Sequence, residues 1–193
     1  TGGIACYKAC EVVRLLKTAG ATVHVAMTAS AREFVTPLTF QTLAGTPVAT
    51  DTFDLTQESE IGHIQLADRA DAVLIAPTTA NVLAKMAHGI ADDLLTTVLL
   101  ATRAPVVVAP AMNVNMWEHP ATQANLEKLL ASGQVTTVGP DAGELACGWI
   151  GAGRLVDPAE ILAAVEARLQ EGEALRGARV VVTAGPTHEP LDD

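Results

Sequence analysis

The chain has 193 residues, of which 49% are hydrophobic and only 3% aromatic, and its formal net charge is −10 at pH 7. This length accommodates one α/β domain, and a core of Ala, Val, Leu and Ile suits helices packed on a buried parallel sheet. The negative charge argues against a nucleic-acid partner, because binding a phosphate backbone needs a basic face. No apolar run reaches the roughly 20 residues of a membrane span. Three cysteines do not make a disulfide framework, and with no signal peptide the chain is expected to be cytoplasmic.

Patterns typical of strands and helices alternate along the chain. Short apolar or alternating runs predict strands over 22–28, 72–77, 105–110 and 134–140. Apolar residues at helical spacing predict helices over 6–20, 80–102 (with a break or bend at Gly89), 121–133 and 157–170, and a broken helical region over 29–45. Repeated strand–helix units imply right-handed crossovers. We therefore expect a three-layer α/β fold around a doubly wound parallel sheet.

The composition divides the chain into a main domain and the beginning of another. Residues 1–5 resemble the turn between a strand and a helix, so the main domain, 1–171, is expected to lack its first strand. Residues 172–177 are polar and glycine-punctuated, as in a linker. Residues 178–193 are expected to open a second domain that is cut short.

Unusual loops follow the predicted strands. On a doubly wound sheet, ligands bind beyond the carboxyl ends of the strands. We expect these loops to form one site, and they comprise residues 1–5, 28–30, 77–81, 110–113 and 139–154.

Two of these loops carry groups that suit a phosphate. Glycines in 1–5 would let backbone N–H groups approach a phosphate at a helix start, although a mere tight turn is the alternative. Thr78, Thr79 and Asn81 repeat the arrangement, and helix capping could explain one of them. No G-x-G-x-x-G pattern is present, which disfavours a dinucleotide dehydrogenase. The two loops fit a mononucleotide better.

Asn113 places a neutral amide in the loop after the predicted strand at 105–110, where an anionic ligand would ordinarily be paired with a cationic side chain. An amide can hold a substrate carboxylate without neutralising it. If that carboxylate leaves as CO₂, a paired Arg would stabilise the ground state more than the transition state and slow the reaction. The alternative is that Asn113 caps or braces its loop.

A histidine and a cysteine are candidates for proton transfer. His63 precedes the strand at 72–77 and could be an acid–base group or a structural histidine. Cys147 lies in a glycine-rich loop that could close over a ligand as a flap, and it could be a proton donor, a nucleophile or a buried inert thiol. Cys6 and Cys10 would share a helical face, but two thiols alone do not bind a metal, so we expect simple packing and no metal site.

Four motifs in series resemble the flavin-containing cysteine decarboxylases: "GHIQLADRAD", "PTTANVLAKMAHGIADDLL", "PAMNVNMW" and "ACGWIGAGR". The resemblance is strongest to the phosphopantothenoylcysteine decarboxylase domains that are fused to a ligase in bacterial coenzyme A biosynthesis. The usual Pro-x-Ser-Ala-Asn of the family is Pro-Thr-Thr-Ala-Asn here, and Thr79 keeps the hydroxyl. The tail "VVVTAGPTHEPLD" resembles the start of the fused phosphopantothenate–cysteine ligase.

The resemblance implies a Rossmann-like, flavodoxin-like flavoprotein and a lyase. Its implied reaction is the FMN-dependent decarboxylation of 4′-phospho-N-pantothenoylcysteine to 4′-phosphopantetheine, through thioaldehyde and enethiolate intermediates. It also implies a trimer-based homo-oligomer, often a dodecamer. CTP and Mg²⁺ would serve only the ligase domain, and the substrate is a small phosphorylated thiol.

The resemblance also assigns roles to residues. His63 is the early base, Asn113 holds the carboxylate and Cys147 donates a proton to the enethiolate. The implied substrate contacts are Asn113, Met116, Leu145 and Ala146, and the implied FMN contacts are Gly3, Ile4, Ala5, Thr28, Ser30, Thr79, Ala80, Asn81, Val82 and Ala111. Two alternatives stay open: a peptidyl-cysteine decarboxylase and a non-catalytic regulatory relative.

Overall fold

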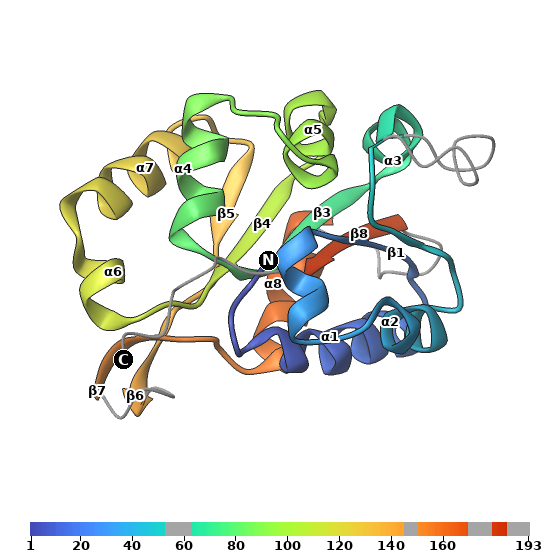
Figure 1. The fold of residues 1–193 in the computed structure, drawn as a ribbon, viewed down its shortest axis with the longest axis horizontal. Coiled ribbons are helices and arrows are strands. Elements are labelled where there is room, and N and C mark those ends of the chain that lie inside the picture. Colours follow the sequence, from blue (N-terminus) through green and yellow to red (C-terminus); the bar gives the residue numbers. More distant parts are fainter. Residues whose placement is uncertain (53–62, 145–149, 170–178, 185–193) are drawn as a thin grey trace.

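A six-stranded parallel sheet forms the centre of the molecule (Figure 1). The computed structural model describes residues 1–52, 63–144, 150–169 and 179–184. The strands lie in the order β2-β1-β8-β3-β4-β5. Their bounds are β1 Thr22–Met27, β2 Val48–Ala49, β3 Ala72–Thr78, β4 Val106–Pro110, β5 Val135–Thr137 and β8 Arg179–Ala184. Every residue of β3 and β4 is buried, as expected for strands covered on both faces.

Helices cover both faces of the sheet (Figure 1). One core contains buried residues of α1 (Cys6–Thr18), α2 (Pro37–Ala44) and α8 (Pro158–Leu169). The other contains buried residues of α3 (His63–Arg69), α4 (Ala80–His88), α5 (Leu94–Ala101) and α7 (Pro120–Leu130). Two short helices, η1 (Ala29–Glu33) and α6 (Val114–Glu118), follow the ends of β1 and β4. The predicted three-layer, doubly wound parallel fold is confirmed.

The predicted helix over 80–102 is two helices. Gly89 ends α4 in the left-handed conformation, with φ +66°, which glycine adopts without steric cost. Asp93 then starts α5 through a reciprocal capping box with Thr96. The chain therefore turns at the glycine where the sequence predicted a break or bend.

The glycine-rich segment, predicted as a loop, contains two paired strands. β6 (Asp141–Glu144) and β7 (Ile150–Arg154) form an antiparallel ribbon, and residues 145–149 between them lie outside the described ranges. Sequence periodicity missed these strands because glycine has a low strand propensity. Here, tertiary contacts of β7 outweigh that propensity.

The strand β8 lies in the middle of the sheet. Val181 is in register with His24 of β1 on one side and with Val73 of β3 on the other. Its residues Val180 and Val182 are fully buried. The sequence expectation assigns 178–193 to a second domain, and that division stays a prediction. In this chain the segment supplies the pairing between β1 and β3.

Within the described ranges, none of the helices combines the length and the hydropathy that crossing a bilayer requires.

Candidate functional site at the carboxyl edge of the sheet

Hydrogen bonds tie the first loop to the loop after β3. The Thr1 hydroxyl donates to the Pro77 carbonyl over 2.5 Å and accepts from the Thr79 N–H over 3.0 Å. Thr1 is fully buried. The two loops that the sequence predicted as phosphate-competent are therefore neighbours. Thr1 received no role from the sequence, and no local pattern could have shown this long-range bond.

The first loop leads into α1 without a polar cap. The Cys6 N–H donates to the Gly3 carbonyl over 2.9 Å, and Ala5, at the N-cap position, has no side chain that could accept a bond. A Cβ added at Gly3 would meet no atom within 4 Å, so this part of the loop faces open space. Ile4 is 59% exposed. Gly3, Ile4 and Ala5 thus lie at a helix start, where backbone N–H groups can donate to an anion.

Thr28 places an unused hydroxyl inside the molecule. It is the N-cap residue of η1, directly after β1, and its side chain makes no cap bond. The Thr28 Oγ1 atom is buried and has no hydrogen-bond partner among the described residues. Buried polar groups are almost always satisfied, so an orphan hydroxyl at a ligand edge indicates a missing partner. Ser30, also predicted to bind the cofactor, lies within η1.

Thr78 ends β3 and Thr79 directly follows it, and their hydroxyls have different roles. Thr78 Oγ1 donates to the Ile75 carbonyl over 2.6 Å and accepts from the Ala109 N–H over 3.1 Å, so it braces β3 against β4. Thr79 caps α4 by accepting from the Val82 N–H over 3.3 Å. The capping alternative is therefore realised by Thr79. Ala80 and the exposed Asn81 form the first turn of α4 beside it.

Asn113 stands at the start of α6, and its loop contacts the loop after β3. The Ala111 N–H donates to the Thr78 carbonyl over 3.1 Å. The Asn113 Oδ1 atom accepts from the Asn115 N–H over 2.8 Å, which caps α6. Asn113 therefore caps the helix, which is the structural role that the sequence analysis gave as an alternative. It fixes the orientation of the amide at the end of β4.

The glycines of β7 bring the ribbon against the Asn113 loop. The Met112 N–H donates to the Gly153 carbonyl over 2.9 Å. A Cβ on Gly151 would lie 2.7 Å from Val114 Cγ2, and one on Gly153 would collide with the Met112 carbonyl. Gly153 also has φ +147°. These glycines are thus required for close packing, and they join the ribbon that flanks Cys147 to the loop that carries Asn113 (Figure 1).

An open hollow of about 340 Å³ lies between the starts of α4, α6 and α7. It brings together Ala80, predicted to bind the cofactor, and Met116, predicted to bind the substrate. Asn115, His119 and Thr122 also line it, and the sequence assigned them no role. His119 caps α7 by accepting from the Ala121 N–H at Nδ1 over 3.2 Å. Its position before Pro120, a frequent first helical residue, was the available signal for this cap.

The remaining predicted residues are less fully described. His63 is the first residue of α3, and its side chain is not described. Leu145, Ala146 and Cys147 lie outside the described residues. Their assigned roles stay predictions.

The other two thiols are placed for packing. Burial raises the pKa of Cys6 to about 11, and burial also raises the pKa of Cys10. Both are free cysteines on α1, and both are protonated at neutral pH. Their surroundings agree with the packing interpretation.

A family match of the chain indicates which ligand the loops at the carboxyl ends of the strands can hold. The family model named Flavoprotein matches residues 1–170. The chain belongs to the flavoprotein family. A flavin is therefore its cofactor, and the orphan hydroxyl of Thr28, the open face at Gly3 and the α1 start fit such a group.

Curated relatives of this flavoprotein chain are longer. It is 51% identical over 192 residues to the coenzyme A biosynthesis bifunctional protein CoaBC of Vibrio cholerae, and 51% identical over 194 residues to that of Bacillus subtilis. Each match covers 100% of this chain and 48% of the relative. The chain thus spans about half the length of these relatives.

Solved flavoprotein structures share the fold. A PPC decarboxylase variant complexed with pantothenoylaminoethenethiol is 33% identical, with a TM-score of 0.74, over 86% of this chain and 92% of that one. The FMN-dependent cysteine decarboxylase SpaF is 32% identical, with a TM-score of 0.70, over 87% and 90%. The FMN-binding protein AtHal3 is 33% identical, with a TM-score of 0.72, over 86% and 91%.

Proposed function

We propose that this flavoprotein is the FMN-dependent decarboxylase of 4′-phospho-N-pantothenoylcysteine, yielding 4′-phosphopantetheine for coenzyme A biosynthesis. The observation that carries the proposal is the docking of the β7 ribbon on the Asn113 loop through the Met112–Gly153 hydrogen bond. That contact brings the segment flanking Cys147 toward a neutral amide at the ligand edge. The identity to CoaBC proteins and the likeness to PPC decarboxylase support the same reaction.

The loops around the first strands would hold FMN. Gly3, Ile4 and Ala5 would present the N–H groups at the start of α1, and Thr28 would present its orphan hydroxyl. The other cofactor contacts that we propose are Ser30, Thr79, Ala80, Asn81, Val82 and Ala111. Neutral amides and hydroxyls suit a phosphate at helix starts without a neutralising cation.

When bound, FMN would supply reversible hydride transfer at the substrate carbon that bears sulfur, which makes the substrate itself an electron sink. The thioaldehyde that forms on the substrate can accept the electron pair of the broken C–C bond, which a simple amide-substituted carboxylate cannot. The overall reaction is redox-neutral.

The protein's own residues would position the substrate and move protons. Asn113 would orient the carboxylate through its amide while leaving the charge free to depart. His63 would take the thiol proton early, and Cys147 would later protonate the enethiolate. The segment around Leu145 and Ala146 would exclude water from these intermediates, and Met116 would contribute an adaptable apolar wall.

Replacing Cys147 by serine tests the proposed proton donor. We expect Cys147→Ser to keep its flavin and to release CO₂, but to accumulate the oxidised enethiol product, because a serine hydroxyl is a far weaker acid than a thiol. Absorbance of bound flavin, CO₂ release and mass spectrometry of the product measure these steps. Cys10→Ser, a half-buried thiol change on α1, is the matched control and should form 4′-phosphopantetheine normally. Normal product from Cys147→Ser would remove Cys147 from the mechanism.

A peptidyl-cysteine decarboxylase is the second candidate, because SpaF, at 32% identity, is a cysteine decarboxylase. The identity to CoaBC proteins is higher, at 51%, and favours the small phosphorylated thiol. Turnover of 4′-phospho-N-pantothenoylcysteine compared with that of a peptide ending in cysteine decides between them. A colourless protein without turnover on either would support the regulatory alternative.

The proposal extends to the full-length protein, its compartment and its assembly. The full-length protein would carry a phosphopantothenate–cysteine ligase that uses CTP and Mg²⁺, as the bifunctional name of the CoaBC relatives suggests. It would be cytoplasmic and would assemble as a trimer-based oligomer, with a dodecamer as the complete form.

A further inference from the structure

The hollow beside the Asn113 loop contains polar groups to which the proposed reaction assigns no role. α7 packs against both α4 and α6, and the hollow lies where the three helices start (Figure 1). The Asn115 N–H donates to the Asn113 Oδ1 atom over 2.8 Å, so the hollow begins directly beside the proposed carboxylate ligand. The residues that line it are Ala80, Asn115, Met116, His119 and Thr122.

His119 is held in one orientation and one tautomer by the helix that it caps. Its Nδ1 atom accepts from the Ala121 N–H over 3.2 Å, and its carbonyl accepts from the Thr122 N–H over 2.9 Å. The Gln123 side chain donates to the Trp117 carbonyl over 2.5 Å, which ties α7 to α6. A neutral imidazole whose Nδ1 accepts a hydrogen bond carries its proton on Nε2. The exposed His119 ring therefore offers an uncharged N–H donor at the hollow.

The character of the lining limits which part of a ligand fits there. None of the five lining residues is Lys, Arg, Asp or Glu. The hollow thus lacks a cation, and His119 already caps α7, so a phosphate group is poorly matched. Ala80 and Met116 supply apolar surface, while the Asn115 amide and the His119 N–H are neutral hydrogen-bonding groups. This mixture suits an uncharged chain that carries amides and methyl groups.

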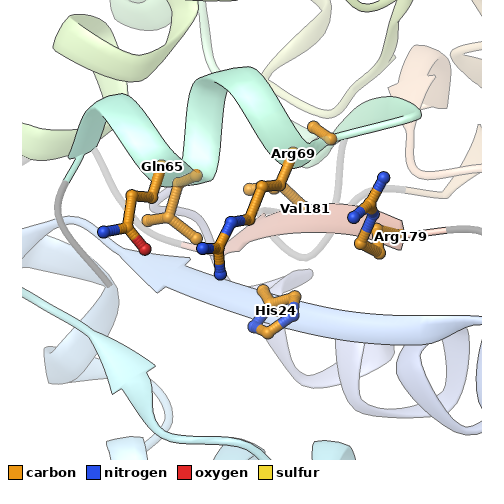
Figure 2. Close-up of a pocket in the computed structure, with 7 residues that line it drawn as sticks. His24, Gln65, Arg69, Arg179 and Val181 are labelled. Carbon is orange, nitrogen blue, oxygen red and sulfur yellow. The ribbon is translucent and has the colours of Figure 1, made fainter. Parts of the chain in front are cut away.

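The size of the hollow agrees with such a chain. Its volume of about 340 Å³ falls within the roughly 300–1,000 Å³ of small-molecule pockets. The cavity in Figure 2, which His24 and Arg69 help to line near the amino ends of β1 and β3, has only about 40 Å³. That is room for the centres of about three water molecules, so it cannot take an organic chain of this length.

We propose that the hollow binds the pantothenoyl arm of the substrate and that the His119 Nε2–H donates to an amide carbonyl of this arm. The inference rests on the proposed function, which places the cysteine carboxylate at Asn113 and Met116 beside the substrate. The arm is joined to the cysteine nitrogen and carries amide groups, a hydroxyl and two geminal methyl groups. These match the neutral donors and the apolar surface of the hollow, and the terminal phosphate lies beyond it. His119 is thus a specificity residue for the acyl chain on the cysteine.

Steady-state kinetics of flavin-loaded His119→Ser test this assignment. Serine is a good N-cap residue, so α7 keeps its cap while the hollow loses the imidazole donor. We expect kcat/KM for 4′-phospho-N-pantothenoylcysteine to fall about fivefold or more, through a higher KM with kcat little changed, because one hydrogen bond of uniform binding is lost. His88→Ser, at an exposed histidine that ends α4, is the matched control and should resemble the wild type.

His119→Ala separates the donor from the cap. It removes both, so it should unfold at a lower urea concentration than His119→Ser. Its KM should nevertheless equal that of His119→Ser, because both variants lack the same donor. A KM that rises only in His119→Ala would show that the cap alone matters, and would overturn the proposal.

A substrate series locates the contact on the arm. N-pantothenoylcysteine, which lacks the phosphate, should lose the same factor in His119→Ser as the phosphorylated substrate. N-acetylcysteine, which lacks the arm, should lose nothing. A loss confined to the phosphorylated substrate, or an equal loss with N-acetylcysteine, would contradict the proposal.

Calorimetry distinguishes failure of this inference from failure of the proposed function. If the wild type decarboxylates none of the three compounds, the proposed function is wrong. Pantetheine carries the arm but no carboxylate, so its binding to the flavin-loaded chain does not depend on turnover. Weaker binding of pantetheine to His119→Ser than to His88→Ser supports the arm site, and equal binding overturns it.

Discussion

Single residues at the ligand edge serve structure and proposed chemistry together. Thr79 and Asn113 both cap helices, and the sequence had offered capping and ligand binding as competing interpretations. A cap does not remove either residue from the site, because the cap bond is what orients the side chain. Thr28 differs, since its buried hydroxyl has no partner among the described residues and is available to a ligand. Sequence patterns predicted Thr28, but they could not distinguish it from Thr79.

Asn113 allows the two roles to be separated. Asn113→Asp keeps an oxygen that can accept from the Asn115 N–H, so α6 should remain capped and the stability nearly unchanged. The added charge would repel the substrate carboxylate, and we expect the KM to rise at least about tenfold with flavin still bound. Asn113→Ala should instead lose about 0.5–2 kcal/mol of stability with the cap. Urea unfolding and steady-state kinetics measure both effects, and an unchanged KM in Asn113→Asp would exclude carboxylate binding by this residue.

At the scale of elements, periodicity predicted what local sequence controls and failed where distant contacts decide. The buried runs of β3 and β4, and the break at Gly89, follow from apolar runs and from the conformational freedom of glycine. The ribbon of β6 and β7 does not follow from local sequence, because its glycines Gly151 and Gly153 are needed for close contact with Val114 and Met112. Those partners come from a separate loop.

The place of β8 in the sheet can be tested with matched valines. Val182 of β8 and Val107 of β4 are both fully buried. If β8 pairs with β1 and β3 in this chain, Val182→Ala and Val107→Ala should each lower the free energy of unfolding by about 1–3 kcal/mol, through lost burial and a residual cavity. Urea unfolding followed by far-UV circular dichroism measures the loss. A neutral Val182→Ala beside a destabilising Val107→Ala would place 178–193 outside the main domain, as the composition suggests.

At the scale of the whole molecule, the helical layer that contains α3 and α5 presents apolar side chains to solvent. Leu100 is 64% exposed, Ile64 is 52% exposed and Ile90 is 46% exposed. α3 packs against α5, so Ile64 and Leu100 belong to one layer. Exposed apolar side chains can belong to a protein interface. This layer is where we expect the proposed trimer contacts.

Light scattering after size exclusion tests that assembly. The flavin-loaded chain should have a mass of at least about three times its 20.0 kDa. Leu100→Glu should shift it toward the monomer, because a buried unpaired carboxylate is costly. Leu38→Glu, at a 70% exposed leucine of α2 in the other layer, should leave the mass unchanged. Dissociation by Leu38→Glu but not by Leu100→Glu would place the interface on the opposite face.

The amino-acid sequence by itself determined the alternation of buried strands and amphipathic helices, and hence the edge at which we expect ligands to bind, because hydrophobic periodicity and glycine conformation act locally. Only the tertiary structure decided which strand fills the centre of the sheet and that Thr1 joins two loops. These groups are far apart along the chain, and packing of the helical layers on the sheet sets their distances.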